Sequence, residues 1–539
     1  MTMNNAASSG ADGKSGATSW LKDGRMLAIL SAAGIGLLLV LLLIRGACAT
    51  PFSDEFYFYK LYASAKQGAI DVNEIFRPHF GHVYVLLKSW LWLVVHYKLD
   101  WRVSMYLQAG FIALTALLLS RYSMPRIAPK LRVYVAVAIA LALGSPRQFE
   151  NLYMAMQVSA AVMVFFACAA FYAVAKYSET EKDRYAMLAI ACAFLSFIST
   201  GGGLMAFVLV LASLLLIAKT NKLRIVIVAA GAAFLLIVAS YMRSALEAGP
   251  MPSLLTAKNF LIYFPAFFAN ALYSFTERGD DVRSICFGVA ILAGAAYAVQ
   301  ATWQEKEKHV LGYLLIGFGL ASCLAIAYAR LKSGIWQPNA PRYYPSAVTL
   351  VIGALLLFAR KQNKDHSRLA LLIVVLVVVS FSKSYRKEWR SAPDRYAYFN
   401  SSHVNLCSGK DEGLAFMGNV KTDSDLKVLR DVFCTDEQKR MLESQPVLLE
   451  IGPTQTSKGM PFNQQPDGQS ALWATTENCE HSCTLVFADV ELPVLANATG
   501  TVVTTNVPPE LFNSSGEKVV YIKNTRSNKK SRTVVFQVN

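Results

Sequence analysis

Long apolar runs separated by short basic loops make up most of the first 385 residues of the chain. A run of about 20 apolar residues can cross the ~30 Å hydrocarbon core of a bilayer as a helix. The pattern therefore predicts a mostly α, polytopic transmembrane bundle of about eleven spans. The expected spans are 26–45, 103–121, 131–145, 154–176, 184–199, 203–219, 223–242, 283–301, 309–330, 344–360 and 367–383.

The basic loops suggest an orientation for the bundle. Lys and Arg concentrate at 121–132, 219–224 and 360–368, as is typical of cytoplasmic loops. Segments 83–95 and 260–275 are ambiguous, but making both cross would put the first two of these loops outside. We therefore expect both segments to lie on the outer surface, the N-terminus to be cytoplasmic and the C-terminus to be periplasmic, in a bacterial inner membrane.

The character of the chain changes after residue 383, where charged residues replace the apolar runs. Residues 1–25 are expected to be a disordered cytoplasmic N-terminus, 26–383 the transmembrane domain with a first outer loop at 47–102, and 384–445 a charged helical connector. Residues 446–539 alternate between short apolar runs and turn residues, which predicts an extracytoplasmic β-rich, sandwich-like domain. The expected strands are 447–451, 471–474, 483–490, 501–505, 519–522 and 533–538.

Composition supports the membrane class, since 54% of the 539 residues are hydrophobic and only 16% are charged. The net charge of +16 does not indicate nucleic-acid binding, because the cations lie in the short loops between spans. The hydrophilic tail holds four of the nine cysteines. In an exported domain these four, Cys407, Cys434, Cys479 and Cys483, suggest two disulfides with three possible pairings.

Two adjacent carboxylates, Asp54 and Glu55, follow the first predicted span. Carboxylates are costly to place at the edge of a membrane, so we interpret the pair as catalytic. A carboxylate near an apolar rim can have its pKa raised toward the range of a general base. The alternative is that one of them caps the following helix, and Asp54 alone could do so. The pair could also hold Mg²⁺ or Mn²⁺, although no full ligand set is visible and no cofactor is certain.

A second polar segment reads Phe76-Arg77-Pro78-His79-Phe80-Gly81-His82, in which Pro78 and Gly81 interrupt helix formation. We call residues 77–82 the elbow. Arg77 could pair with a phosphate, while His79 and His82 could position a substrate. The alternative is a helix-entry turn with interfacial polar groups.

Further candidates border other predicted spans on the same side of the membrane. The first group is Glu150, Asn151 and Gln157, whose amides and carboxylate suit a hydroxyl-rich sugar, although helix capping explains them nearly as well. The second is Arg342-Tyr343, which could contact a phosphate or could anchor the helix at the interface.

The order of these motifs along residues 26–400 resembles that of bacterial polytopic glycosyltransferases of the GT-C superfamily, especially the O-antigen glucosyltransferase-like, serotype-conversion type. The shared features are Asp54-Glu55-Phe56 after the first span, the Pro78-His79 elbow, Gln148-Phe149-Glu150-Asn151 with Gln157, Ser199-Thr200-Gly201-Gly202, and a late Arg342-Tyr343. The chain departs from such proteins at Gly81 and Val83, where they often carry an acidic residue and an arginine.

The resemblance implies a polyprenyl-phosphate-linked sugar as donor, inverting transfer on the outer face, and an acidic base in the first outer loop. The expected partners are that donor, a cell-surface glycan or lipid-linked acceptor, and membrane lipids. The alternatives are a lipid-glycan flippase or transporter, which would carry ionisable residues within its spans, and an O-antigen polymerase or ligase, whose large polar loop usually comes late.

Overall fold

The structure is a computed structural model and divides into two compact units. It describes residues 24–49, 51–79, 82–246, 264–272, 281–330, 340–360, 364–408, 423–436, 446–477, 479, 483–497, 501–525 and 528–539. The helical unit comprises Met1–Ala47, Asp71–Val94 and Leu99–Tyr396, and the tail unit comprises Cys48–Ile70, Val95–Lys98 and Ala397–Asn539. Each unit is described by itself.

Helices cover all eleven of the predicted spans, so their helical structure is confirmed. They are α2 (Gly24–Gly46), α6 (Arg102–Ser123), α7 (Arg132–Leu143), α9 (Val158–Thr180), α10 (Asp183–Ser199), α11 (Gly203–Ile217), α12 (Asn221–Leu246), α14 (Asp281–Thr302), α15 (Val310–Arg330), α16 (Tyr344–Arg360) and α17 (Lys364–Ser408). Among the described residues, eight helical segments are long and apolar enough to cross a membrane. One of these, Val282–Tyr328, contains both α14 and α15. The count of eleven spans stays a prediction.

Neighbouring helices in the chain pack antiparallel and close together. Gly312 of α15 lies against Leu357 of α16. Gly319, seven residues later in α15, lies against Leu350, seven residues earlier in α16, so these two helices run in opposite directions. A Cβ on Gly353 would stand 2.7 Å from the carbonyl oxygen of Gly312. Small residues at a contact allow the backbones of two membrane helices to approach closely. The resulting van der Waals packing stabilises the pair, because apolar side chains gain little by leaving apolar lipid.

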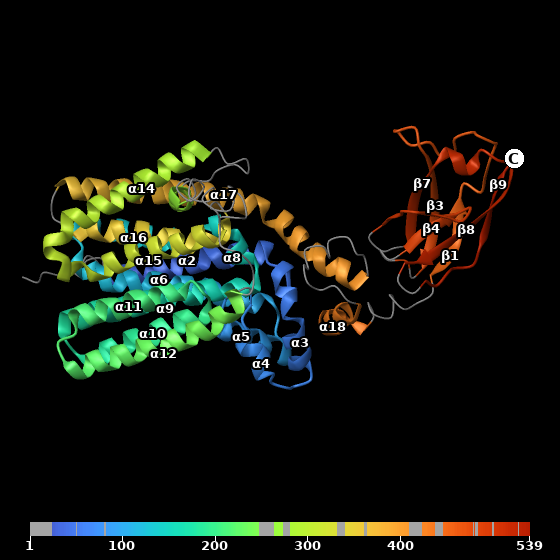
Figure 1. Cartoon of the computed structure of the whole chain (residues 1–539). Coiled ribbons are helices and arrows are strands. Elements are labelled where there is room, and N and C mark those ends of the chain that lie inside the picture. Colours follow the sequence, from blue (N-terminus) through green and yellow to red (C-terminus); the bar gives the residue numbers. More distant parts are fainter. Residues whose placement is uncertain are drawn as a thin grey trace, which may run out of the picture. The chain divides into compact units, whose positions relative to one another are not determined.

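Short helices lie at one end of this bundle, where Figure 1 places α4, α5 and α8. They are α4 (Val72–Phe76), α5 (Val85–His96), η4 (Pro146–Gln148), α8 (Phe149–Tyr153), η5 (Ala155–Gln157) and η9 (Pro341–Tyr343). Helix α5 covers the ambiguous segment 83–95, and its 12 residues span about 18 Å, too short for the ~30 Å core. Of segment 260–275, only residues 264–272 lie within the described part.

Within its described residues, the tail unit contains η1 (Ser53–Phe58), α3 (Tyr59–Lys66), α18 (Asp423–Phe433) and nine strands. The strands are β1 (Val447–Gly452), β2 (Gln455–Thr456), β3 (Ser470–Glu477), β4 (Cys483–Phe487), β5 (Val490–Leu492), β6 (Leu495–Ala496), β7 (Val502–Val507), β8 (Gly516–Asn524) and β9 (Val534–Val538). They form one sheet in the order β1-β3-β7-β6 and another in the order β2-β9-β8-β4-β5.

The two sheets share one apolar core, to which Leu472 and Val503 of the first sheet and Phe487 and Phe536 of the second contribute. The β-rich C-terminal region is confirmed, and strands lie at five of the six predicted positions. The predicted strand 483–490 is wrong as a single strand, because β4 ends at Phe487 and β5 begins at Val490, while β2 and β6 were not predicted. Of the three possible disulfide pairings, the structure has Cys407–Cys434 and Cys479–Cys483. The first joins the end of α17 to the residue after α18.

We expect Gly203→Ala to destabilise the helical unit, because its Cβ would lie 2.1 Å from the carbonyl oxygen of Ser196, a main-chain atom of the preceding helix α10. Overpacking of this kind costs roughly 1–3 kcal/mol. The matched control is Gly110→Ala, where a Cβ meets no atom within 4 Å. Thermal unfolding in detergent, followed by fluorescence-detected size exclusion, should show a lower midpoint for Gly203→Ala alone. Equal midpoints would contradict the close packing of this turn.

Candidate functional site

The bend between α7 and α9 contacts the start of α16 through polar groups. Arg342 Nε lies 4.0 Å from Glu150 Oε2, and Asn151 Nδ2 donates to the main-chain oxygen of Arg342 at 3.3 Å. We call residues 144–157 together with 341–343 the polar bend. Two of the motifs found in the sequence, almost 200 residues apart, are thus brought together at one end of the bundle.

A second set of hydrogen bonds ties this bend to residues 264–272. Arg147 Nη2 donates to Asn270 Oδ1 at 3.1 Å, and Asn270 Nδ2 donates to the main-chain oxygen of Ala340 at 3.2 Å. The other terminal nitrogen of Arg147, Nη1, is buried and has no hydrogen-bond partner within the described residues. Arg147 was not among the residues singled out in the sequence, because its partner lies 123 positions away.

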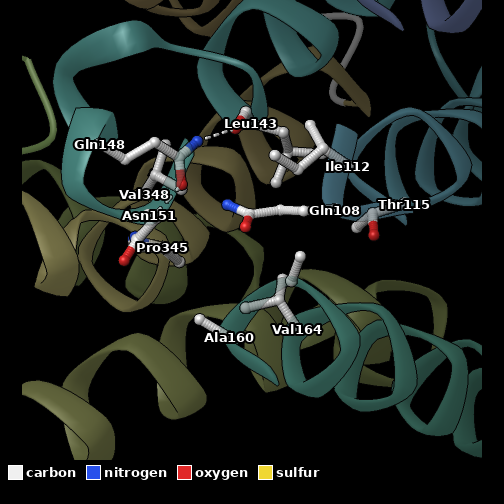
Figure 2. Close-up of a pocket in the computed structure, with 11 residues that line it drawn as sticks. Gln108, Ile112, Thr115, Leu143, Gln148, Asn151, Ala160, Val164, Pro345 and Val348 are labelled. Atoms are coloured by element: carbon white, nitrogen blue, oxygen red, sulfur yellow. Dashed lines mark hydrogen bonds between the residues drawn. The ribbon is translucent and has the colours of Figure 1, made fainter. Parts of the chain in front are cut away.

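A small, mostly apolar cavity lies beside the bend, and its polar lining residues are Gln108 and Thr115 of α6 and Gln148 and Asn151 of the bend. Figure 2 shows Gln108 pointing toward the side of the cavity where Gln148 and Asn151 lie. Gln148 Nε2 donates to the main-chain oxygen of Leu143 at 2.6 Å.

The polar side chains of this cavity are buried but incompletely bonded. Gln108 and Asn151 are 1% and 0% exposed, and neither Gln108 Oε1 nor Asn151 Oδ1 has a partner within the described residues. The cavity has a volume of about 20 Å³, which is room for about one water molecule. A water there would supply the donors that the two amide oxygens lack. Gln108 is a polar residue inside a span that the sequence reading missed.

Two main-chain hydrogen bonds join His79 and His82 of the elbow. His79 N donates to His82 O at 3.0 Å, and His82 N donates to His79 O at 2.8 Å. The ring of His82 lies against the Ser199–Gly202 turn, since a Cβ on Gly201 would stand 2.6 Å from His82 Nδ1. Two further sequence motifs, the Pro-His elbow and the Ser/Thr-Gly turn, therefore contact each other.

Lys88 of α5 forms hydrogen bonds to the main chain of α4 and of the elbow. Its side chain is almost fully buried, and its Nζ donates to the main-chain oxygens of Glu74 at 2.6 Å and Arg77 at 2.7 Å. Burial lowers the pKa of Lys88 to about 8. The residue fixes the position of α4 and of the elbow relative to α5.

His79 and Arg77 of the elbow have different surroundings. Burial, followed by the charges of Lys88 and His82, lowers the pKa of His79 to about 4, so this imidazole is neutral near pH 7. It can exchange hydrogen bonds with a substrate but does not bring a positive charge. The Arg77 side chain is 62% exposed and pairs with Glu74 at 3.0 Å, so its guanidinium remains accessible to an anion.

The acidic pair belongs to the tail unit, and its two members have different environments. Glu55 is fully buried, and its Oε2 accepts a hydrogen bond from the main-chain N–H of Phe52 at 2.7 Å. Glu55 therefore caps η1, which bears out the alternative that one member of the pair is a helix cap, with Glu55 rather than Asp54 in that role. The Asp54 side chain is half-buried. The pKa of Tyr57 is raised, mainly by the burial of Tyr57 and secondly by the negative charge of Asp54. Asp54 is the member of the pair that a substrate can reach.

The donor set around this pair does not fit a metal ion held by the protein alone. One oxygen of Glu55 is already engaged by Phe52, whereas Mg²⁺ requires octahedral oxygen coordination. Across the described residues, no group of three or more His, Cys, Asp or Glu side chains gathers in a way that could hold a metal ion.

The remaining candidates lie at the edges of the polar bend. The ring of Tyr343 packs edge-on against Phe267 with centroids 5.6 Å apart, and its hydroxyl is buried without a partner among the described residues. Gln157 is half-buried at the N-terminus of α9, six residues after Asn151 in the chain.

The fold and these contacts define a class of protein: a helical protein with apolar helices suited to a membrane, polar groups at one end of its bundle, and a β-rich C-terminal region. No family model matches the chain, and no curated protein matches it in sequence.

The environment of His79 predicts a pH dependence of stability. Its pKa is about 4 in the folded protein against 6.5 for an unperturbed imidazole, so the unfolded chain takes up the proton first as the pH falls. The contribution of the neutral imidazole is complete above pH 6.5 and is lost between pH 6.5 and 4. Over that interval, the unfolding midpoint of wild-type protein should fall by roughly 2–4 °C more than that of His79→Gln.

Unfolding midpoints of both proteins, measured in detergent at half-unit pH intervals, test this expectation. The difference between them at pH 7.5, where the imidazole is neutral in either state, gives the effect of the substitution on packing and serves as the reference. Curves that stay parallel down to pH 4 would show that His79 is not held in its neutral form.

Proposed function

We propose that the protein is an integral membrane glycosyltransferase of the GT-C type. In this proposal it moves a sugar from a polyprenyl-phosphate donor to a cell-surface glycan or a lipid-linked acceptor on the outer, periplasmic face of a bacterial inner membrane. The observation that carries the proposal is the convergence of distant motifs. The Glu150-Asn151 segment contacts Arg342, and the His79–His82 elbow contacts the turn at Gly201.

The chemistry of such a transfer requires a general base, and it breaks one bond at the anomeric carbon of the donor as it forms another. A base takes the proton of the acceptor hydroxyl, whose oxygen then forms a bond to the anomeric carbon of the donor. The bond from that carbon to the phosphate oxygen breaks, and the polyprenyl phosphate leaves with the electron pair. The anomeric configuration inverts, because the acceptor attacks from the face opposite to the leaving phosphate.

Asp54 is the proposed base. Its carboxylate is half-buried in a short segment that also contains the aromatic side chains of Phe56, Tyr57 and Phe58, so it lies at an apolar but accessible position. Glu55 is assigned a positioning role, since its carboxylate closes the turn that carries Asp54. Proton transfer by a well-placed carboxylate contributes about 10²–10⁴-fold to a rate.

Arg342 and Arg77 are the proposed cations for the donor phosphate. The Arg342 side chain is 34% exposed, and its 4.0 Å separation from Glu150 is longer than a close hydrogen-bonded ion pair. A guanidinium can form two parallel hydrogen bonds to a phosphate, which is the chemical reason for this assignment. His79, His82, Asn151, Gln157 and Tyr343 are proposed to bind the hydroxyl groups of the sugar or acceptor.

We expect Asp54→Asn and Glu55→Gln to have different effects. Asp54→Asn removes the base and should lower turnover by about 10²–10⁴-fold with an unchanged unfolding midpoint. Glu55→Gln keeps a side-chain oxygen that can accept from Phe52 N–H, so turnover should stay within about tenfold of wild type. The measurement is sugar transfer by purified protein in detergent with a panel of polyprenyl-phosphate sugars and a native glycan acceptor, with and without EDTA.

Wild-type turnover in Asp54→Asn would remove that residue from the mechanism. The EDTA arm reports on metal dependence independently of the substitutions. If the folded wild-type protein transfers no sugar from any donor in the panel, the flippase and ligase alternatives become the better explanations.

We expect the Glu150–Arg342 pair to control donor affinity in a defined direction. Arg342→Gln should raise the KM for the polyprenyl-phosphate sugar by about tenfold or more, because a charge-assisted contact to phosphate is lost. Glu150→Gln removes the competing carboxylate and should leave this KM unchanged or lower it. Steady-state kinetics with varied donor concentration measures both, and an equal rise in KM for the two variants would show that the pair acts only in folding.

A further inference from the structure

Helix α17 is much longer than a membrane span. Its 45 residues extend over about 68 Å, whereas the hydrocarbon core is about 30 Å thick. The apolar part, residues 369–381, exposes aliphatic side chains such as Leu372, Val375 and Val379, as lipid-facing positions do. Residues 385–390 lie about 6–14 Å beyond Phe381, the distance that places them among lipid headgroups.

An open hollow of about 340 Å³ lies on this part of α17 and is lined by Tyr385, Arg386, Trp389 and Arg390. Arg386 and Arg390 are exposed and stand four residues apart, so both guanidinium groups lie on one face of the helix. Aromatic rings continue this face toward the membrane. Tyr385 stacks on Phe381 with centroids 5.6 Å apart, and on Trp389 with centroids 6.1 Å apart.

The hollow is held against the first helix of the bundle. Arg45, in the last turn of α2, donates through Nε to the main-chain oxygen of Trp389 at 2.9 Å, and its guanidinium carbon lies 5.1 Å from the centre of the Trp389 ring. The hydroxyl of Tyr385 donates to the main-chain oxygen of Leu38 at 3.3 Å. A third guanidinium is therefore fixed beside the ring that lines the hollow.

We propose that this hollow binds the phosphate headgroup of a membrane lipid, with Arg386 and Arg390 holding the phosphate and the Tyr385 and Trp389 rings packing on the glycerol and upper acyl carbons. The site is separate from the polar bend and the elbow, and its existence does not depend on glycosyl transfer.

The charges around the hollow favour an anion of this kind. Lys383 and Lys387 add two exposed cations to the same segment. The acidic side chain within it, Glu388, is 3% exposed and is paired with Arg395 at 3.2 Å, so it does not face the headgroup layer. Guanidinium groups bind phosphate through two parallel hydrogen bonds, and aromatic rings with a polar edge prefer the interface between lipid tails and water.

The test compares two pairs of substitutions on the same helical segment. Arg386→Gln/Arg390→Gln removes the two cations that line the hollow. Lys383→Gln/Lys387→Gln removes the same net charge from exposed positions with the same spacing that do not line it. Native mass spectrometry of the full-length protein in detergent counts bound phosphatidylglycerol, with phosphatidylcholine of the same chain length as the zwitterionic reference.

We expect wild-type protein to retain phosphatidylglycerol over phosphatidylcholine and the arginine pair to weaken phosphatidylglycerol binding by about tenfold or more. The lysine pair should weaken it by less than about threefold, and Arg386→Lys/Arg390→Lys should fall between the two. Equal losses for the arginine and lysine pairs would overturn the proposal in favour of a diffuse positive surface. Unchanged binding in the arginine pair, or displacement of the lipid by an equal concentration of inorganic phosphate, would also overturn it.

Discussion

The absence of water from the interior of a bilayer is the constraint on which the rest of this structure depends. A polar group that leaves water must find a partner within the protein, so the loops and bends between spans carry their own hydrogen bonds. The bend after α7 shows how this is met: Gln148 donates to the carbonyl oxygen of Leu143, Arg147 reaches Asn270, and Asn151 reaches the main chain of Arg342. The same bonds that satisfy the bend also gather the polar side chains proposed to bind substrate.

Periodic features of the chain were predictable from the sequence because they depend on local pattern. Each predicted span coincides with a helix, and five of the six predicted strands with a single strand, since apolar length and period-two alternation reflect burial directly. The exception is 483–490, where a turn at 488–489 separates β4 from β5. The contacts within the candidate site were not predictable in this way. Arg147 and Asn270 are 123 residues apart, and nothing near either residue indicates the other.

The acidic pair shows why residue type alone did not settle the individual roles. Asp54 and Glu55 have the same charge and adjacent positions, but only Glu55 has the reach to return to the main chain at Phe52. Its longer side chain forms the cap and becomes buried, which leaves Asp54 accessible. Lys88 is a comparable case, because an apparently interfacial lysine proves to bind two main-chain oxygens of the elbow region.

The direction of the first and last helices limits the number of crossings. Tyr385 contacts Leu38 and, further along both helices, Trp389 contacts Arg45, so α2 and α17 run parallel. Because each crossing reverses the chain, parallel first and last spans require an odd total. An arrangement in which just one of segments 83–95 and 260–275 crosses would have twelve spans and antiparallel ends. Eleven crossings meet this requirement, as any odd number does, so the count of eleven stays a prediction.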